Sequence, residues 1–224
     1  LRATSTFVTA LQNGAREVIP VSEISEAVAR RQAQPSVRLA GERDGVRIRA
    51  TQSGGTDFDF GNSPREFTPE KSRGATIVST TTNGTRALRA CAGAQTVLAA
   101  SFLNLVATAK FLQAGNFSEI LLVCAGTGEG VALEDVLAAG ALAELLSTHG
   151  NTHPALTDSS QIALKAFAQS KADLPAAIAS SQNGRRLLAI PELRDDVAFC
   201  AQRDIFDLVA VMNVDGAIRR SAPK

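Results

Sequence analysis

The feature that most constrains this chain is a repeated order of short apolar run, polar turn and helical stretch. Residues 75–79 lead into a threonine-rich turn over 80–85, and residues 119–124 (EILLVC) lead into AGTGEG and a helix over 133–146. The run at 119–124 has the strongest pattern of a buried strand. Such units in series predict an α/β fold with helices on both faces of a sheet. Ligands of such folds bind beyond the carboxyl ends of strands.

The other apolar and polar runs extend this pattern over the whole chain. The long irregular stretch over 52–71 is typical of a functional loop. No internal repeat or linker interrupts the sequence, which predicts one domain over 1–224. Further strands are expected at 17–21, 37–39, 46–48, 96–100 and 206–212, and further helices at 4–13, from Ser22 onward, from Arg86 onward, and at 102–113, 158–169 and 174–180.

Composition excludes several classes of partner. The net charge is +1 and the basic residues are scattered, whereas nucleic-acid binding needs a clustered basic stripe. No run approaches the roughly 20 apolar residues of a membrane span, so no membrane partner is expected. The three cysteines are odd in number and widely spaced, which argues against a disulfide framework. We therefore expect a cytoplasmic protein.

The turn from Thr80 to Arg86 is the first candidate site. It falls where a strand ends and a helix begins, and free N–H groups with the positive end of the helix dipole favour an anion there. Gly84 permits a close backbone approach, and the threonine hydroxyls and the Asn83 amide add neutral hydrogen bonds. Ordinary helix capping is the alternative explanation for the same residues.

The second candidate is the glycine-rich segment Cys124–Gly130. It lacks the Lys-Ser or Lys-Thr of a Walker loop. The spacing of its glycines does not match the dinucleotide-binding fingerprint, and no arginine follows at the distance that a tyrosine-phosphatase loop requires. The alternative is a glycine-rich turn beside an inert buried thiol.

Acidic residues near the expected loops are candidate metal ligands. Glu42 follows a predicted strand, and Glu134 and Asp135 begin the strongest helix. Mg²⁺ takes one or two carboxylates together with water and phosphate oxygens. The alternative for Glu134 and Asp135 is a favourable interaction with the helix dipole. His149 and His153 are expected to be solvated in a loop rather than to bind a metal.

Several short segments, in order along the chain, resemble the 2-phosphosulfolactate phosphatase (ComB) family. The resemblance runs from Leu1 to about Val211, and Thr81–Ala87 (TTNGTRA) is its most recognisable stretch. The other segments are LRATST at 1–6, GER at 41–43, GNSP at 61–64 with Phe67-Thr68, ASFLN at 100–104, CAG at 124–126, LED at 133–135, and FCA at 199–201 with Asp204.

The resemblance implies a three-layer α/β/α fold around a mixed sheet. It also implies Mg²⁺-dependent removal of phosphate from 2-phospho-3-sulfolactate, which gives 3-sulfolactate and in methanogens serves coenzyme M biosynthesis. Family members carry an Asp at the end of a first strand, just before the segment that resembles LRAT. We therefore expect that the domain at 1–224 lacks this first strand. A homodimer is expected from the general frequency of two-fold assemblies.

Under this interpretation the substrate carries a phosphate and a sulfonate, so two anion sites are needed. The guanidinium groups of Arg2 and Arg86 match phosphate geometry. Cys124 lacks a nearby His or Arg in sequence that would activate a thiolate. The predicted catalytic residues are Arg2, Glu42, Asn83 and Glu134. The predicted substrate-binding residues are Asn62, Ser63, Thr82, Gly84, Thr85, Arg86, Asn104, Cys124 and Gly126. The predicted Mg²⁺ ligands are Glu42, Glu134 and Asp135.

Two alternatives belong to other functional classes. One is a phosphatase or lyase that acts on a different small anionic phosphoester, because one fold hosts many functions. The other is a non-catalytic protein that binds a small anion. A substrate panel would identify the first alternative, because dependence on the sulfonate should vanish. A binder would bind its ligand without metal and release no phosphate.

Overall fold

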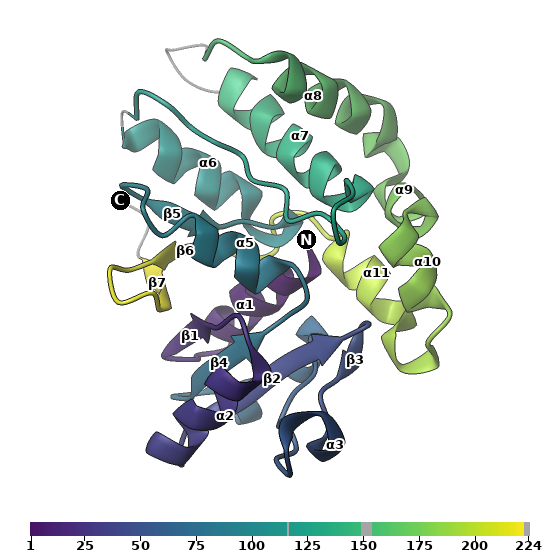
Figure 1. The fold of residues 1–224 in the computed structure, drawn as a ribbon. Helices are drawn as coiled ribbons and strands as arrows, with labels where there is room; N and C mark the ends of the chain where they lie inside the picture. Colours follow the sequence, from purple (N-terminus) through teal and green to yellow (C-terminus); the bar gives the residue numbers. More distant parts are fainter. Residues whose placement is uncertain (116, 149–153, 222–224) are drawn as a thin grey trace.

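The computed structural model describes residues 1–115, 117–148 and 154–221 as an α/β fold with a seven-stranded sheet (Figure 1). The strand order is β3-β2-β4-β1-β7-β6-β5. Strands β2, β4 and β1 are parallel, and the other pairings are antiparallel, so the sheet is mixed as predicted. The strands are β1 Glu17–Pro20, β2 Arg38–Arg43, β3 Val46–Arg47, β4 Thr76–Thr80, β5 Val97–Ala99, β6 Val209–Met212 and β7 Ile218–Ser221.

Helices surround this sheet. The helix predicted at 102–113 is a 3₁₀ turn η2 (Phe102–Asn104) followed by α6. The helices are α1 Arg2–Gln12, α2 Ile24–Ala33, α3 Ala50–Ser53, α4 Pro69–Ser72, α5 Gly84–Ala90, α6 Leu105–Ala114, α7 Leu133–Thr148, α8 Asp158–Ser170, α9 Leu174–Ser180, α10 Gln182–Leu188 and α11 Arg194–Cys200, with the further 3₁₀ turns η1 Pro64–Glu66, η3 Lys171–Asp173 and η4 Pro191–Leu193.

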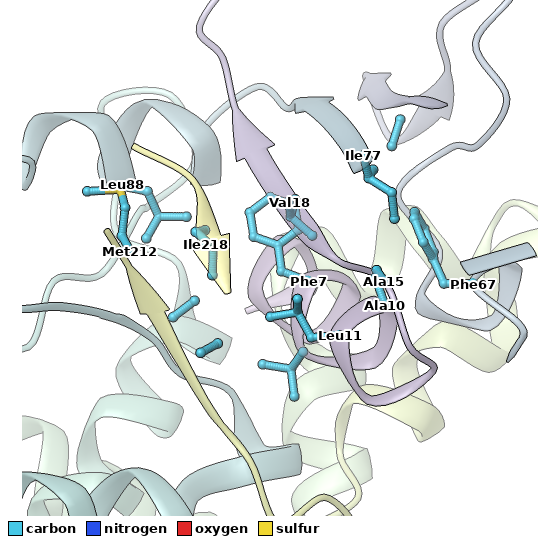
Figure 2. Close-up of a cluster of buried hydrophobic side chains, with 14 of the residues drawn as sticks. Phe7, Ala10, Leu11, Ala15, Val18, Phe67, Ile77, Leu88, Met212 and Ile218 are labelled. Atoms are coloured by element: carbon cyan, nitrogen blue, oxygen red, sulfur yellow. The ribbon is translucent and has the colours of Figure 1, made fainter. Parts of the chain in front are cut away.

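Strand β4 shows why the sheet is covered on both faces. All five of its residues are buried, as expected for a parallel strand between two helical layers. Ile77 joins a core cluster with Phe7 of α1, whereas its neighbour Val78 joins a cluster with Ala27 of α2. Figure 2 shows the side chains of the first cluster. Because successive side chains point to opposite faces, α1 and α2 form layers on opposite sides of the sheet.

Helices α6 to α11 gather around a separate core cluster in the second half of the chain. In Figure 1, α7 and α8 lie side by side. Gly140 permits this contact, because a Cβ at this position would lie 2.1 Å from the carbonyl oxygen of Ala163. None of the helices in the described ranges has the length and apolarity needed to cross a membrane.

The strand predicted at 119–124 is wrong. In the structure these residues form an extended segment outside the sheet, and Leu121 and Val123 are 79% and 52% exposed. They line an apolar groove of about 620 Å³ together with β5 and Leu1. A strand needs a hydrogen-bonded neighbour, and none of the strands in the described ranges pairs with this segment. The run is apolar because Ile120 and Leu122 pack against a core cluster, and this contact requires no neighbouring strand.

The remaining predictions agree with the structure apart from element ends and omissions. The last predicted strand is shorter, as β6, and the sequence analysis missed β7, α10 and α11. The stretch over 52–71 is irregular as predicted, apart from three short helical turns. His149 and His153 lie outside the described residues. The first strand expected ahead of Leu1, and the single-domain assignment, stay predictions.

Candidate active site

The candidate site lies at the carboxyl ends of β2 and β4, which are adjacent and parallel. Glu42 in β2 is 6% exposed. Its Oε1 accepts hydrogen bonds from the backbone N–H and the hydroxyl of Thr82, at 2.8 and 3.0 Å, and its Oε2 accepts one from the Gly45 N–H at 2.8 Å. One carboxylate therefore joins the β2–β3 turn to the loop after β4.

The loop after β4 holds the residues of the first predicted site. The Thr85 hydroxyl is fully buried and accepts from the Thr81 N–H at 3.0 Å, so it caps the turn. A Cβ at Gly84 would lie 2.6 Å from the Cβ of Ala3, so this glycine permits α5 to approach α1. Thr82 and Arg86 are exposed, and the Thr82 N–H and hydroxyl are already donated to Glu42. The turn therefore has internal hydrogen bonds that cap it, and its role in anion binding stays a prediction.

The second predicted loop lies against the first. Asn83 Oδ1 accepts from the Gly128 N–H at 3.3 Å, and Asp135 Oδ2 accepts from the Gly126 N–H at 2.9 Å. Asp135 Oδ1 accepts from the Leu1 nitrogen at the start of α1. The structure therefore brings together the 81–84 loop, the 125–130 loop, and the starts of α1 and α7.

Glu134, beside Asp135 in α7, is held by a residue that the sequence analysis missed. Asn183 of α10 donates from its Nδ2 to Glu134 Oε1 and to the Thr127 hydroxyl, both at 2.6 Å. Glu134 Oε2 is buried without a hydrogen-bond partner among the described residues, and we call it the open oxygen. Glu134 itself is 8% exposed. No sequence signal singled out Asn183, because it lies in a short helix that was not predicted.

Arg2, the first residue of α1, reaches the same region. Its Nη2 donates to the carbonyl oxygen of Gly45 at 3.3 Å. Its Nη1 lies 3.8 Å from Oδ2 of Asp196, a fully buried carboxylate in α11. Burial raises the pKa of Asp196, and the hydrogen bond from Ser63 and the charge of Arg2 oppose this rise. The sequence analysis missed Asp196, because an Asp-Asp pair resembles an ordinary helix start.

Three predicted substrate-binding residues have contacts of other kinds. Ser63 donates to Asp196 Oδ1 at 2.6 Å. The backbone oxygen of Asn62 accepts from the Thr6 hydroxyl at 2.9 Å, and its side-chain oxygen is buried without a partner in the described part of the chain. Asn104 is fully buried and links the Ser101 N–H to the Leu208 carbonyl oxygen, at 3.0 and 3.2 Å. Its amide therefore serves the fold, and its predicted role in binding stays a prediction.

Cys124 lies at the start of the second loop and is exposed. Partial desolvation, followed by the nearby charge of Asp135, raises the pKa of its thiol. Burial raises the pKa of Cys200 in α11 to about 11. Both thiols are therefore protonated at neutral pH. Because the thiolate is the reactive form, this argues against a cysteine nucleophile.

The acids of the site can be tested against the predicted Mg²⁺. Among residues 1–115, 117–148 and 154–221, no group of three or more Asp, Glu, His or Cys side chains is arranged to hold a metal. Mg²⁺ needs only one or two carboxylates when water and substrate complete its shell. Glu134, with its open oxygen, fits this requirement, whereas both oxygens of the adjacent Asp135 already accept hydrogen bonds, from Gly126 and Leu1. Glu42 would first have to give up backbone hydrogen bonds.

The mixed sheet has guanidinium and amide groups and buried acids at the carboxyl ends of its parallel strands, which is where α/β enzymes bind small ligands. The particular family follows from comparison with known proteins. The family model described as 2-phosphosulpholactate phosphatase matches residues 1–215. The chain belongs to this family, and the resemblance predicted from its motifs is confirmed.

Curated relatives agree with this assignment. Each of the following is named as a probable 2-phosphosulfolactate phosphatase. A protein of Caldanaerobacter subterraneus subsp. tengcongensis is 38% identical over 226 residues, which cover 99% of this chain and 88% of the relative. One of Thermotoga petrophila is 39% identical over 212 residues, covering 95% and 86%. One of Synechococcus sp. (strain JA-3-3Ab) is 38% identical over 213 residues, covering 93% and 84%.

Proposed function

We propose that this protein hydrolyses 2-phospho-3-sulfolactate to 3-sulfolactate and phosphate, with Mg²⁺ as cofactor. Family membership supports the reaction class, a phosphoric monoester hydrolase. The observation that carries the proposal is the convergence of the family's separate motif segments at one sheet edge. Glu42 binds Thr82, Asn83 binds the 125–130 loop, and Asp135 binds that loop and the start of α1.

The donors of the site suit a substrate with two anionic groups. Phosphoryl transfer needs little covalent chemistry from the protein, so catalysis depends on positioning and on neutralising charge. Arg2 offers guanidinium donors beside the β2–β3 turn. Thr82 is exposed in the 81–84 loop, and its hydroxyl would have to turn from Glu42 Oε1 to donate to a substrate anion. Arg86, two residues after Gly84, provides a second, exposed cation. In our proposal some of these groups bind the phosphate and the others bind the sulfonate.

The acids of α7 supply the negative charge that a cation requires. The open oxygen of Glu134 would hold Mg²⁺ at the start of α7, and Asp135 would join it by giving up the hydrogen bond from the Gly126 N–H. When bound, the cation neutralises phosphate charge and polarises the phosphoryl oxygen. Asn183 keeps the Glu134 side chain in place through Oε1, so that Oε2 stays directed away from this contact.

The test is phosphate release from 2-phospho-3-sulfolactate, measured with Mg²⁺ and again with EDTA. We expect release that requires Mg²⁺ and falls when 2-phospholactate, which lacks the sulfonate, replaces the substrate. Release from both compounds at equal rates would favour a phosphatase for another small phosphoester. Binding of the substrate without Mg²⁺ and without release would favour a non-catalytic anion binder. A version with the predicted first strand restored belongs in the same assay.

A further inference from the structure

Asp196 is a buried charge that the proposed chemistry does not yet use. It lies in α11 (Figure 1), which packs against α1 and η1. Its Oδ1 accepts from Ser63, and its Oδ2 has no hydrogen-bond partner among the described residues. Burying an ion costs several kcal/mol unless a partner compensates. The contacts of Asp196 should therefore reveal which positive charge it balances.

Arg2 is the complementary group. Its Nη1 is buried, lacks a hydrogen-bond partner in the described residues, and lies 3.8 Å from the Asp196 Oδ2 that also lacks one. Arg65 Nη1 lies 3.9 Å from Oδ1, but the side chain of Arg65 is 39% exposed and also pairs with Asp195 at 2.9 Å. Arg2 is the more buried of the two arginines, so it depends more on a fixed counter-charge.

The other end of the Arg2 guanidinium leads to the candidate site. Its Nη2 donates to the Gly45 carbonyl oxygen, and the Gly45 N–H donates to Glu42 Oε2. A guanidinium has five N–H donors, so contacts with Gly45 and Asp196 leave donors for a ligand. Arg2 therefore lies between the buried Asp196 and the β2–β3 turn that carries Glu42.

We infer that Asp196 is a positioning residue for Arg2, which fixes the guanidinium so that its remaining donors face the substrate anion. This inference rests on the proposed function. Asp196 balances the charge of Arg2 when the site is empty, so Arg2 stays ordered without a ligand. Donors held in place before the substrate binds need no reorganisation during the reaction.

The alternative is that Asp196 only anchors the 61–64 turn through Ser63. A double-mutant cycle separates the two roles, because a residue that acts through Arg2 loses its effect once Arg2 is replaced. The four proteins are wild type, Asp196→Asn, Arg2→Met and the double variant. Phosphate release from 2-phospho-3-sulfolactate with Mg²⁺ gives kcat and KM, and circular dichroism with thermal unfolding shows that each protein is folded.

We expect Asp196→Asn to lower kcat/KM by about 10- to 100-fold, because small misplacements of a binding group have effects of this order. In the Arg2→Met background the same change should cost less than about threefold. Asp195→Asn is the matched control: it removes the same charge one residue away, from a side chain that is 74% exposed and pairs with Arg65. Exposed ion pairs contribute little, so kcat/KM should stay within about twofold.

An equal loss in both backgrounds, or no loss in either, would overturn the inference. If Asp196→Asn does not fold, Ser63→Ala removes only the hydroxyl at Oδ1. It should lower kcat/KM by about three- to tenfold with Arg2 present and leave it unchanged with Arg2→Met.

If wild type releases no phosphate, the proposed function fails, and the cycle is repeated with inorganic phosphate as ligand in titration calorimetry. Weaker phosphate binding by Asp196→Asn, seen only when Arg2 is present, would still support the positioning role. Absence of phosphate binding by wild type would reject both.

Discussion

Glu42 and Glu134 are buried to nearly the same extent, 6% and 8% exposed, yet their surroundings differ. Both oxygens of Glu42 accept hydrogen bonds from the protein's own loops. Glu134 has one oxygen bound to Asn183 and one open oxygen. Burial alone therefore does not distinguish an acid that holds the site together from an acid that is free to bind a cation or substrate.

The difference has opposite consequences for stability. An unsatisfied buried acceptor costs about 1–3 kcal/mol, whereas each hydrogen bond to a charged group contributes about 1.5–3 kcal/mol. Glu42 should therefore stabilise the fold, and Glu134 should weaken it in the absence of a cation. A buried polar atom without a partner is expected at a functional site, where a residue that lowers stability is kept because it takes part in the chemistry.

Replacing Glu134 with Gln should have the largest effect on activity. The change removes the negative charge at the open oxygen, so we expect kcat to fall by about 100-fold or more, as for loss of a group that stabilises the transition state. The free energy of unfolding should stay the same or rise. Mg²⁺ binding, measured by calorimetry without substrate, should weaken in parallel. Glu129→Gln, an exposed acid in the 125–130 loop, is the control. Full activity in Glu134→Gln would contradict the proposal that the open oxygen of Glu134 binds a cation or the substrate.

Replacing Glu42 with Gln should lower the stability of the fold and should reduce activity less than Glu134→Gln does. The new NH₂ group would face backbone N–H donors, so the free energy of unfolding should fall by about 1–3 kcal/mol. Activity of the folded protein should fall by about tenfold, because Thr82 and Gly45 lose their common anchor. Denaturant unfolding and phosphate release check the two parts. A large loss of Mg²⁺ binding with unchanged stability would instead make Glu42 a direct metal ligand.

The sequence predicted these acids but could not rank them. Strand and helix patterns follow from local periodicity, so most element positions were predicted, and the structure brings the TTNGTRA segment close to the start of the helix that begins with LED. Whether an oxygen is already bonded depends on residues distant in sequence, such as Thr82 for Glu42 and Asn183 for Glu134. Asp196 and Asn183 were missed for the same reason.

The error at 119–124 has a related cause. Its apolar pattern is local, but a strand depends on a hydrogen-bonded neighbour that lies elsewhere in the chain. In the structure the segment forms the wall of an apolar groove next to β5. The residue pattern therefore gave this segment both the wrong secondary structure and too much burial.

Asn183→Asp should have a smaller effect on activity than Glu134→Gln, and its pH dependence tests the contact between Asn183 and Glu134. The new carboxylate would lie within hydrogen-bonding distance of Glu134 Oε1, and two like charges raise the pKa of one member of the pair. Activity at neutral pH should fall by about tenfold, in the range for residues that support metal ligands. Activity should recover as pH rises, because the raised pKa means that both acids are ionised only at higher pH. Asn183→Ala should lose activity without this pH dependence.

Cys124→Ser should have the smallest effect. Cys124 is near Asp135, the neighbour of Glu134 in α7. Desolvation together with the Asp135 charge raises the pKa of the Cys124 thiol. A raised thiol pKa means less thiolate at any given pH, so alkylation by iodoacetamide should be slow at neutral pH and accelerate only in alkaline buffer. Serine cannot replace a thiolate nucleophile, yet kcat should stay within about threefold of wild type if carboxylates and arginines carry the chemistry. A loss of 100-fold or more in folded Cys124→Ser would place the nucleophile at the thiol and reduce Glu134 to a supporting charge.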